Sequence, residues 1–552
     1  MKRTKRIFAI FMTMALAMSM LIVSSAVSFA DGDTTPTTYT ITINKDGTDK
    51  AAHTYGAYQV FKGDLKEESS GTATTKTLSN IQWGDNIDSD KVGTLIADLN
   101  TALALTGDNA IKSTATAADV AKAISGANVG NNSAKAQAVA AAFEKALKGD
   151  PKGTGSVAAD AQSGEIKNLP AGYYLVKDTA AVTGEGASTR YILQVVSNVE
   201  VTEKASVPSV VKKVQDVNDS KATSTTDPKN PTDWQDSADY DIGDDVPFQL
   251  TATTASTAND YVKYHVTFQD TQSEGLDKPS SFNVSVLGQT IALSSNAVGT
   301  EGTASTASTN ITAKVVAPEE GKTFAIKVSF ESKTEGAKLT DVASTPIVVT
   351  YSSKLNDKAK LGSTGNPNEV YLKYSNNPNK TDDSEEGKTP EDKVIVFTYK
   401  VVVNKVDQNK QPLVGASFKL SKKNAEGKYE EIRTIDGTNL STFEWTGVDD
   451  GDYKLEETAT PSGYNTIDPI EFTVSAEHTV IGDNPTLTKL EGGDKFTGEV
   501  STGQLKAQIV NEKGATLPST GGIGTIIFYV LGSLLVVGCG IVLISKRRME
   551  SR

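Results

Sequence analysis

A strand with a lysine on its inward face opens the C-terminal region of this sequence. Val401, Val403 and Lys405 share one parity in the strand predicted at 401–406, so their side chains should face the same core. A buried ammonium group is costly, and desolvation lowers the pKa of a lysine. The pattern therefore predicts a neutral, nucleophilic amine at Lys405.

A second strand repeats this pattern at the start of the middle region. Val210, Lys212 and Val214 share a parity, so Lys212 should point inward and Lys213 outward. A neutral amine in a dry core can attack a carbonyl if a carboxamide and an acid converge on the same place. Both strands are therefore candidates for an internal crosslink.

The region around Lys405 carries the motifs of a known family. It reads LVGASFKL at 413–420, YKLEET at 453–458 and PSGY at 461–464. It thereby resembles the CnaB-type immunoglobulin-like domains of Gram-positive surface proteins and pili. The last two motifs match the pilin E-box, with Glu457 as its acid.

The resemblance implies a self-generated amide between Lys405 on the first strand and Asn511 on the last. Glu457 would have its pKa raised by burial and would share a proton with the Asn511 amide, which polarises the carbonyl for attack. The alternative is a Lys405–Glu457 salt bridge with Asn511 as a turn residue.

The middle region resembles the CnaA-like domain of pilus backbones through YHVTFQD at 264–270. The resemblance implies Asp270 as the acid beside Lys212. Asn368, which precedes a predicted strand, fits the family pattern best as the amide partner. The competing asparagines are Asn356 and Asn376.

The first region offers a weaker version of the same set. YLVKDT at 174–179 echoes the E-box with Asp in place of Glu. Lys45, Asp178 and Asn198 are then candidates for the amine, the acid and the amide. First domains of such proteins often lack the bond, so ordinary strand ends with polar side chains are the preferred interpretation.

The junction between the first and middle regions holds a separate lysine. Residues 199–204 read VEVTEK, a partial match to the pilin motif Val-x-Val-Tyr-Pro-Lys, with Thr and Glu in place of Tyr and Pro. In that family the lysine attacks the sortase-bound threonine of the next subunit. The resemblance implies Lys204 as this acceptor, with Lys212, Lys213 and nearby lysines as alternatives.

The C-terminus combines three features in a fixed order. A pentapeptide resembles the LPXTG signal that sortase transpeptidases read, and the uncharged stretch 523–544 is long enough to cross a bilayer. The basic tail at 546–548 should stay on the cytoplasmic side. A sortase would cut after Thr520 and pass the acyl group to an amine; an ordinary membrane anchor is the alternative. The pentapeptide consists of Leu517, Pro518, Ser519, Thr520 and Gly521.

The N-terminus predicts export. Residues 1–6 hold four basic side chains, 7–23 are apolar, and Ser28 and Ala30 are the small residues expected before a cleavage site at Asp31. A true membrane helix is the alternative, but the polar chain that follows argues against it.

Composition limits the remaining functions. The net charge of −13 argues against nucleic-acid binding, which needs basic patches. The single cysteine, Cys539, lies in the apolar C-terminal stretch, so disulfides are not expected. The histidines His53, His265 and His478 are scattered without metal-ligand spacing, so we expect neither a metal nor a cofactor.

Strand-like alternation recurs along the exported part, and Ala-rich segments at 92–105 and 117–147 predict helices inserted in the first domain. The segment 297–309, rich in Ser, Thr, Gly and Ala, should be a surface excursion.

The predicted fold is mainly β, with tandem immunoglobulin-like sandwiches stacked end to end as a stiff rod. The predicted parts are a signal peptide at 1–30, a CnaB-like first domain at 31–205, a CnaA-like middle domain at 206–399, a CnaB-like domain with the E-box at 400–514, and the sorting signal, membrane helix and basic tail at 515–552.

Together these features resemble a sortase-assembled major pilin, the backbone subunit of Gram-positive pili. The resemblance implies a surface protein of the cell wall that is a sortase substrate rather than an enzyme. Its expected partners are pilus-specific and housekeeping sortases, other copies of itself, minor pilins, peptidoglycan at the pilus base and a host matrix ligand. A wall-anchored adhesin or ancillary pilin that does not polymerise is one alternative, and a wall-anchored enzyme is the other.

Overall fold

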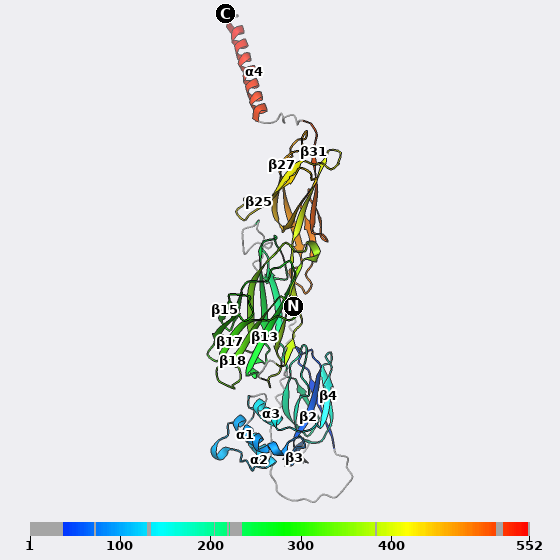
Figure 1. Cartoon of the computed structure of the whole chain (residues 1–552), viewed down its shortest axis with the longest axis vertical. Coiled ribbons are helices and arrows are strands. Elements are labelled where there is room, and N and C mark those ends of the chain that lie inside the picture. Colours follow the sequence, from blue (N-terminus) through cyan, green and yellow to red (C-terminus); the bar gives the residue numbers. More distant parts are fainter. Residues whose placement is uncertain are drawn as a thin grey trace.

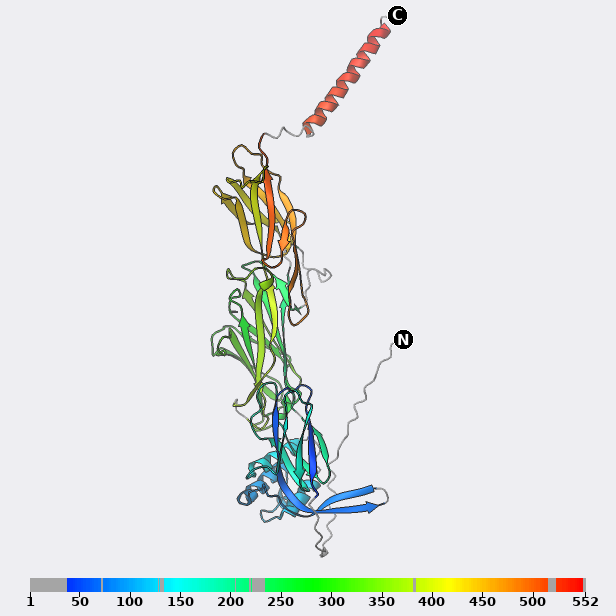
Figure 2. The same cartoon turned by 90° about the vertical axis from the view of Figure 1, so that its right-hand side faces the viewer.

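Three β-rich bodies follow one another along the chain and lie end to end (Figure 1). The computed structural model describes residues 37–70, 73–127, 129, 134–203, 205–217, 220, 234–380, 384–514 and 523–549. Figure 2 shows the same order from the side, with the C-terminal helix α4 beyond the last body. The predictions of a mainly β fold with tandem domains and of an elongated stack are confirmed.

The first body is a sandwich extended by helices. A sheet in the order β5-β1-β8 packs against one in the order β3-β2-β6-β7, with β4 paired to β2, around a core of inward side chains such as Ile41, Tyr55 and Val176. The strands are β1 (Tyr39–Asn44), β2 (His53–Ser70), β3 (Ala73–Trp83), β4 (Gly153–Val157), β5 (Ser163–Leu169), β6 (Gly172–Asp178), β7 (Arg190–Val195) and β8 (Val199–Thr202).

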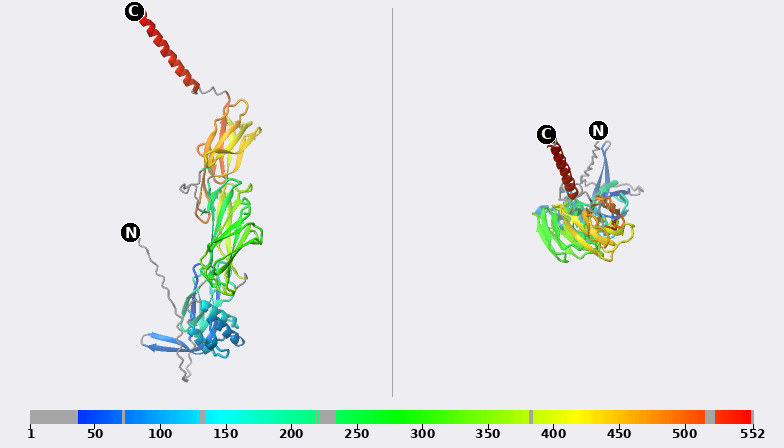
Figure 3. Two further views of the ribbon diagram at one scale, coloured as in Figure 1. Left: turned by 90° about the vertical axis from the view of Figure 1, so that its left-hand side faces the viewer. Right: turned by 90° about the horizontal axis from the view of Figure 1, so that it is seen from above.

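Three helices fill the long connection between β3 and β4, as the Ala-rich segments predict. They are α1 (Val92–Leu103), α2 (Ala117–Gly126) and α3 (Ala134–Lys145). A capping box in which Thr116 and Asp119 bond each other's backbone N–H begins α2. The helices bury Leu99, Val120 and Phe143 in a second core and gather at the end of the molecule farthest from α4 (Figure 3).

The middle body is a sandwich of two larger sheets, in the orders β10-β9-β12-β19-β14-β15 and β11-β22-β20-β13-β18-β17-β16. Strands of the first sheet are β9 (Ser209–Gln215), β10 (Trp234–Gln235), β12 (Asp245–Thr253), β14 (Phe282–Val286), β15 (Gln289–Leu293) and β19 (Pro346–Lys354). Strands of the second are β11 (Ser237–Asp239), β13 (Lys263–Gln272), β16 (Glu301–Ser305), β17 (Thr309–Val316), β18 (Phe324–Ser332), β20 (Asn366–Ser375), β22 (Asp392–Phe397) and β21 (Glu386–Lys388), which pairs with β20.

The segment 297–309, predicted as a surface excursion, does lie at the surface, but part of it is a strand. Residues 301–305 form β16, which pairs in register with β17 at the edge of the second sheet. The burial of this strand alternates only between exposed and half-buried, and its half-buried residues, Gly302 and Ala304, are too small to form a clear apolar face. A strand without an apolar face leaves little trace in the sequence.

The last body packs a sheet in the order β26-β23-β31-β30 against one in the order β25-β24-β27-β28-β29. Its strands are β23 (Tyr399–Asp407), β24 (Ala416–Lys423), β25 (Tyr429–Gly437), β26 (Thr442–Val448), β27 (Gly451–Ala459), β28 (Ile470–His478), β29 (Leu487–Glu491), β30 (Thr497–Glu499) and β31 (Gln504–Asn511). Its first and last strands, β23 and β31, pair in parallel along their length, which brings the two ends of the body side by side.

Hydrogen bonds cross both junctions. Between the first two bodies, Asn376 donates through Nδ2 to the Val182 carbonyl at 2.7 Å, and Ser188 N–H donates to the Asn376 carbonyl at 2.7 Å. Between the middle and last bodies, Lys422 forms an ion pair with Asp241 at 2.7 Å, and only Thr398 separates β22 from β23. Such short, bonded junctions favour a stiff stack.

Candidate intramolecular crosslink sites

Lys405 lies in β23 where its alternation predicts, and its side chain is fully buried. The register of β23 with β31 places it opposite Ile509, with Asn511 two residues further along the neighbouring strand. Its Nζ donates to the Ile509 carbonyl at 3.0 Å. Burial lowers the pKa of Lys405 to about 8, although the charge of Glu457 opposes the shift. The amine is thus closer to its neutral form than an exposed lysine would be.

Glu457 holds the amide of Asn511. The Asn511 Nδ2 donates to Glu457 Oε1 at 2.9 Å and to Oε2 at 3.2 Å, and both side chains are buried. Ile467 N–H also donates to Glu457 Oε2 at 3.0 Å and fixes the carboxyl. The Asn511 Oδ1 is buried without a hydrogen-bond donor among the described residues. The side-chain carbonyl oxygen of Asn511 is therefore free to accept a proton.

The alternative of a Lys405–Glu457 salt bridge with Asn511 in a turn does not fit this geometry. No ion pair within 4 Å joins these two side chains, both of which the structure describes, and Asn511 is the last residue of β31. The structure brings an amine, a carboxamide and an acid into one core. These are the three groups that amide formation needs.

In the middle body, Lys212 is also fully buried, while Lys213 pairs with Asp236 at the edge of the core. The Lys212 amine forms an ion pair with Asp270, which lies on the opposite sheet. Burial lowers the pKa of Lys212 and raises that of Asp270, while their mutual attraction opposes both shifts. The two pKa values move toward each other, which eases transfer of the proton from the amine to the acid.

Asn368 reaches this pair through a residue that sequence reasoning missed, Tyr351. The Lys212 amine donates to Tyr351 Oη at 3.0 Å, Asn368 Nδ2 donates to the same oxygen at 3.0 Å, and Tyr351 Oη–H donates to Asp270 at 3.2 Å. The Asn368 Oδ1 is buried and has no hydrogen-bond donor among the described residues. Tyr351 shares the inward parity of β19 with Ile347 and Val349, and a buried tyrosine hydroxyl needs a partner, which was the available signal.

The competing asparagines lie elsewhere. Asn356 donates to the Glu274 carbonyl at 2.9 Å and to Asp277 at 2.8 Å in a surface turn. Asn376 lies at the junction with the first body, where it bonds the Val182 carbonyl. Of the three, only Asn368 is in the hydrogen-bond network of Lys212 and Asp270.

The first body does not bring its three candidates together. Lys45 donates to the carbonyls of Ala158 and Ala159 at 3.3 and 3.0 Å, and Asn198 is exposed and accepts from Thr40 N–H at 3.0 Å. Asp178 instead contacts His53 Nδ1 at 2.9 Å. The crosslink set Lys45–Asp178–Asn198 is therefore not assembled, which agrees with the preferred interpretation of polar strand ends.

Comparison with known proteins adds family relationships. Residues 399–485 match the family model of the SpaA prealbumin-like fold domain, and residues 509–551 match that of the LPXTG cell wall anchor motif. The trypsin-resistant surface T6 protein of Streptococcus pyogenes serotype M6 is 27% identical over 407 residues, which span 62% of this chain and 70% of that protein. The chain is a relative of the sortase-assembled backbone pilins.

A solved structure of the same relative supports the fold. The T6 backbone pilin of serotype M6 Streptococcus pyogenes, described as a modular three-domain structure, superimposes with a TM-score of 0.50 at 17% identity. The superposition covers 88% of this chain and all of that chain. The three consecutive bodies of this pilin relative thus follow an arrangement already seen in a backbone pilin.

The anchor of this pilin relative begins after the last body. The helix α4 (Ile523–Met549) is apolar up to its basic last turn at 546–548, and its segment Phe528–Met549 is long and apolar enough to cross a membrane. Together with the matched anchor motif, it makes the chain a cell-wall-anchored surface protein. The signal peptide, Lys204, Thr520 and the rest of the sorting pentapeptide lie outside the described residues.

A buried histidine, which the sequence shows without metal-ligand spacing, lies among three carboxylates in the structure. His53 lies between the carboxylates of Asp49, Asp178 and Glu203 in the first body. Burial alone would lower the pKa of His53, but these carboxylates raise it to about 10. Asp49 lies four residues before His53, but Asp178 and Glu203 are distant in the sequence, so local spacing could not reveal the whole group.

Proposed function

We propose that this chain is polymerised covalently into a surface pilus by a class C-type sortase. Thr520 would be the acyl donor of one copy and Lys204 the acceptor of the next. Head-to-tail joining of a donor and an acceptor at separate places gives open-ended growth. A housekeeping sortase would attach the last copy to peptidoglycan, minor pilins would join the same fibre, and the fibre would support adhesion to a host matrix ligand.

The end-to-end stack of bodies is the observation that carries this proposal. The acceptor lies in the passage from β8 to β9, where the chain leaves the first body for the middle body. The donor follows the last body, beyond β31. The middle and last bodies therefore lie between the two reactive positions, and each added copy lengthens the fibre by about this span.

Within each copy, two amides would resist force. The neutral amine of Lys405 would attack the side-chain carbonyl carbon of Asn511, the bond from that carbon to the amide nitrogen would break, and ammonia would leave. Glu457 would give a proton to the carboxamide and take one from the attacking amine. Lys212, Asn368 and Asp270 would react in the same way, with Tyr351 holding the amine and the amide.

These crosslinks stabilise by restricting the unfolded chain. A crosslink that closes roughly 100 residues contributes about 4.7 kcal/mol in the chain-entropy treatment. The bond in the last body would also join β23 to β31, the strands at which the chain enters and leaves that body. Tension would then pass through the crosslink instead of unzipping the sheet. Beyond this single-turnover reaction, the chain would catalyse nothing.

The test is an immunoblot of wall extracts from cells that express Lys204→Ala. The proposal expects the high-mass ladder of the parent to collapse to a single band. Lys213→Ala is the matched control, because this lysine lies near the same junction and should leave the ladder intact. An unchanged ladder in Lys204→Ala would refute the acceptor, and a single band in the parent would favour a non-polymerising adhesin.

A further inference from the structure

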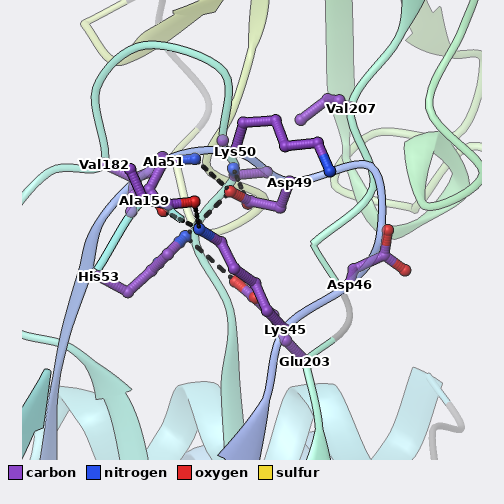
Figure 4. A network of polar contacts seen from close by, with 12 residues as sticks. Lys45, Asp46, Asp49, Lys50, Ala51, His53, Ala159, Val182, Glu203 and Val207 are labelled. Atoms are coloured by element: carbon purple, nitrogen blue, oxygen red, sulfur yellow. Dashed lines mark hydrogen bonds and ion pairs between the residues drawn. The ribbon is translucent and has the colours of Figure 1, made fainter. Parts of the chain in front are cut away.

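A histidine and three carboxylates form a closed group in the first body. Side chains of His53, Asp49 and Glu203 are buried, with 2%, 1% and 3% of their surface exposed. Figure 4 shows Asp49 and Glu203 on either side of the His53 ring. Asp49 lies in the β1–β2 connection, His53 is the first residue of β2, and Glu203 directly follows β8. The group ties three separate segments together.

The ring nitrogens of His53 have different surroundings. Nδ1 lies 2.9 Å from Asp178 Oδ1, which fixes the ring and allows Nδ1–H to donate. Nε2 lies 3.2 Å from Asp49 Oδ1 and 3.3 Å from Glu203 Oε1, yet it has no aligned hydrogen-bond partner among the described residues. Two carboxyl oxygens thus flank Nε2 without accepting a directed bond from it.

The distances from His53 Nε2 to the oxygens of Asp49 and Glu203 match the distance between neighbouring ligand atoms around a bound metal ion. Zn²⁺ binds histidine nitrogen and carboxylate oxygen at about 2.0–2.1 Å, so neighbouring ligands in a tetrahedral site are about 3.3 Å apart. The three ligand atoms lie within 4.8 Å of one another. A carboxylate that accepts the other ring N–H, as Asp178 does, is the usual outer partner of a metal-binding histidine.

Another histidine and carboxylate group among the described residues fits less well. His478 Nε2 lies 3.6 Å from Asp216 and 3.8 Å from Asp239, too far for one small coordination shell.

The neighbouring cation of the His53 group, Lys45, donates to the backbone carbonyls of Ala158 and Ala159. The structure describes Lys45, Asp49 and Glu203, and no ion pair within 4 Å joins Lys45 to either carboxyl group.

We propose that Asp49, His53 and Glu203 bind a divalent transition metal ion, and that Zn²⁺ fits these ligands best. Metal binding needs Nε2 without a proton, while Nδ1 keeps its proton and donates it to Asp178, so metal and proton compete for Nε2. Three protein ligands leave the fourth position to water. Calcium, which takes six to eight oxygen ligands, is disfavoured by the imidazole.

The site would fix the end of β8. Tyr55 Oη donates to Glu203 Oε1 at 2.9 Å, and Glu203 N–H donates to the Asn44 carbonyl at 2.7 Å, so the backbone is already held at this point. A metal would add a bond from this residue to the β1–β2 connection. Lys204 is the next residue in the sequence, so the metal would anchor the chain next to it. Metal binding itself is independent of whether Lys204 is a sortase acceptor.

The experiment titrates Zn²⁺ into the purified full-length protein in detergent by calorimetry, and records X-ray absorption of the zinc-loaded form. We expect one zinc per chain with one imidazole and oxygen ligands. His53→Gln and the near-isosteric Glu203→Gln should lose this equivalent. Asp178→Asn, a positioning residue, should weaken binding by about 10–100-fold.

The matched control is His265→Gln, because both ring nitrogens of this buried histidine already contact Ser375 and Glu386 at 2.8 Å. It should keep the zinc equivalent. No zinc uptake by the parent, a spectrum without imidazole, or equal uptake by His53→Gln and Glu203→Gln would overturn the site. The parent spectrum decides the matter even if a variant fails to fold.

Discussion

The middle and last bodies differ in which group the buried acid contacts: the lysine amine in the middle body and the asparagine carboxamide in the last body. In the middle body Asp270 pairs with the amine of Lys212, whereas in the last body Glu457 holds the carboxamide of Asn511. Lys405 is left against a backbone carbonyl. The same three chemical groups are thus assembled from two starting hydrogen-bond patterns. In the proposed reaction of the middle body, the proton would first pass from Lys212 to Asp270, whereas in the last body the pKa of Lys405 is already lowered by burial.

The largest effect should come from Asp270→Asn. It removes the acid of the middle crosslink and leaves Lys212 buried without a counter-charge. Loss of a crosslink that closes roughly 150 residues costs about 5 kcal/mol, and the uncompensated charge adds about 3–5 kcal/mol. Denaturant unfolding measures the loss, and intact mass should show one ammonia more than in the parent. Asp357→Asn, at an exposed position, should change neither. Complete ammonia loss in Asp270→Asn would exclude the acid's role.

Glu457→Gln should have the next largest effect. Without the acid, Lys405 and Asn511 stay unlinked, and the last body loses about 4.7 kcal/mol of crosslink stabilisation. Mass spectrometry of this variant should again show one retained ammonia. The adjacent Glu456 forms an ion pair with Lys419 at 2.8 Å outside the core, so Glu456→Gln serves as the control. Equal masses for the two variants would contradict the assignment.

Tyr351→Phe should slow the middle crosslink without abolishing it. The hydroxyl binds both Lys212 and Asn368, and the loss of these two hydrogen bonds, at about 0.5–1.5 kcal/mol each, corresponds to a roughly tenfold slower reaction. A time course of ammonia loss in freshly synthesised protein measures the rate. The last body of the same molecules is the internal control, because its rate should not change.

A pH dependence should appear when the last body cannot react. In Asn511→Ala, the folded pKa of Lys405 is lowered from 10.5 to about 8, so between these values the unfolded chain binds more protons. The free energy of unfolding should therefore rise as the pH increases from about 8 to about 10.5. The double variant with Lys405→Met should lack this rise, and a fall over the same range would contradict the lowered pKa.

The smallest effect is expected in the first body. Asn198→Ala should leave the number of ammonia molecules lost unchanged, because Asn198 contacts Thr40 instead of Lys45 or Asp178. Intact mass should differ from the parent only by the substitution. One fewer ammonia lost would mean that the first body forms a crosslink after all.

Alternation alone was enough to place Lys405 and Lys212 in their cores, since parity in a strand decides which face a side chain joins. The Ala-rich segments likewise predicted the helices of the first body. Alternation could not identify β16, whose half-buried face carries only the small residues Gly302 and Ala304. It also could not choose among Asn356, Asn368 and Asn376, because that choice depends on which strand faces Lys212 across the sandwich.

The sequence by itself determined the export and anchoring signals, the mainly β fold and the inward lysines, because each depends on composition or on neighbours along the chain. Only the tertiary structure decided which groups meet. It placed Tyr351 between Lys212 and Asn368, and it separated Lys45 from Asn198. It also brought Glu203 to Asp49 and His53, which are only four residues apart in the sequence. Contacts across a sandwich join residues far apart in sequence, and their register is fixed by packing of the whole core.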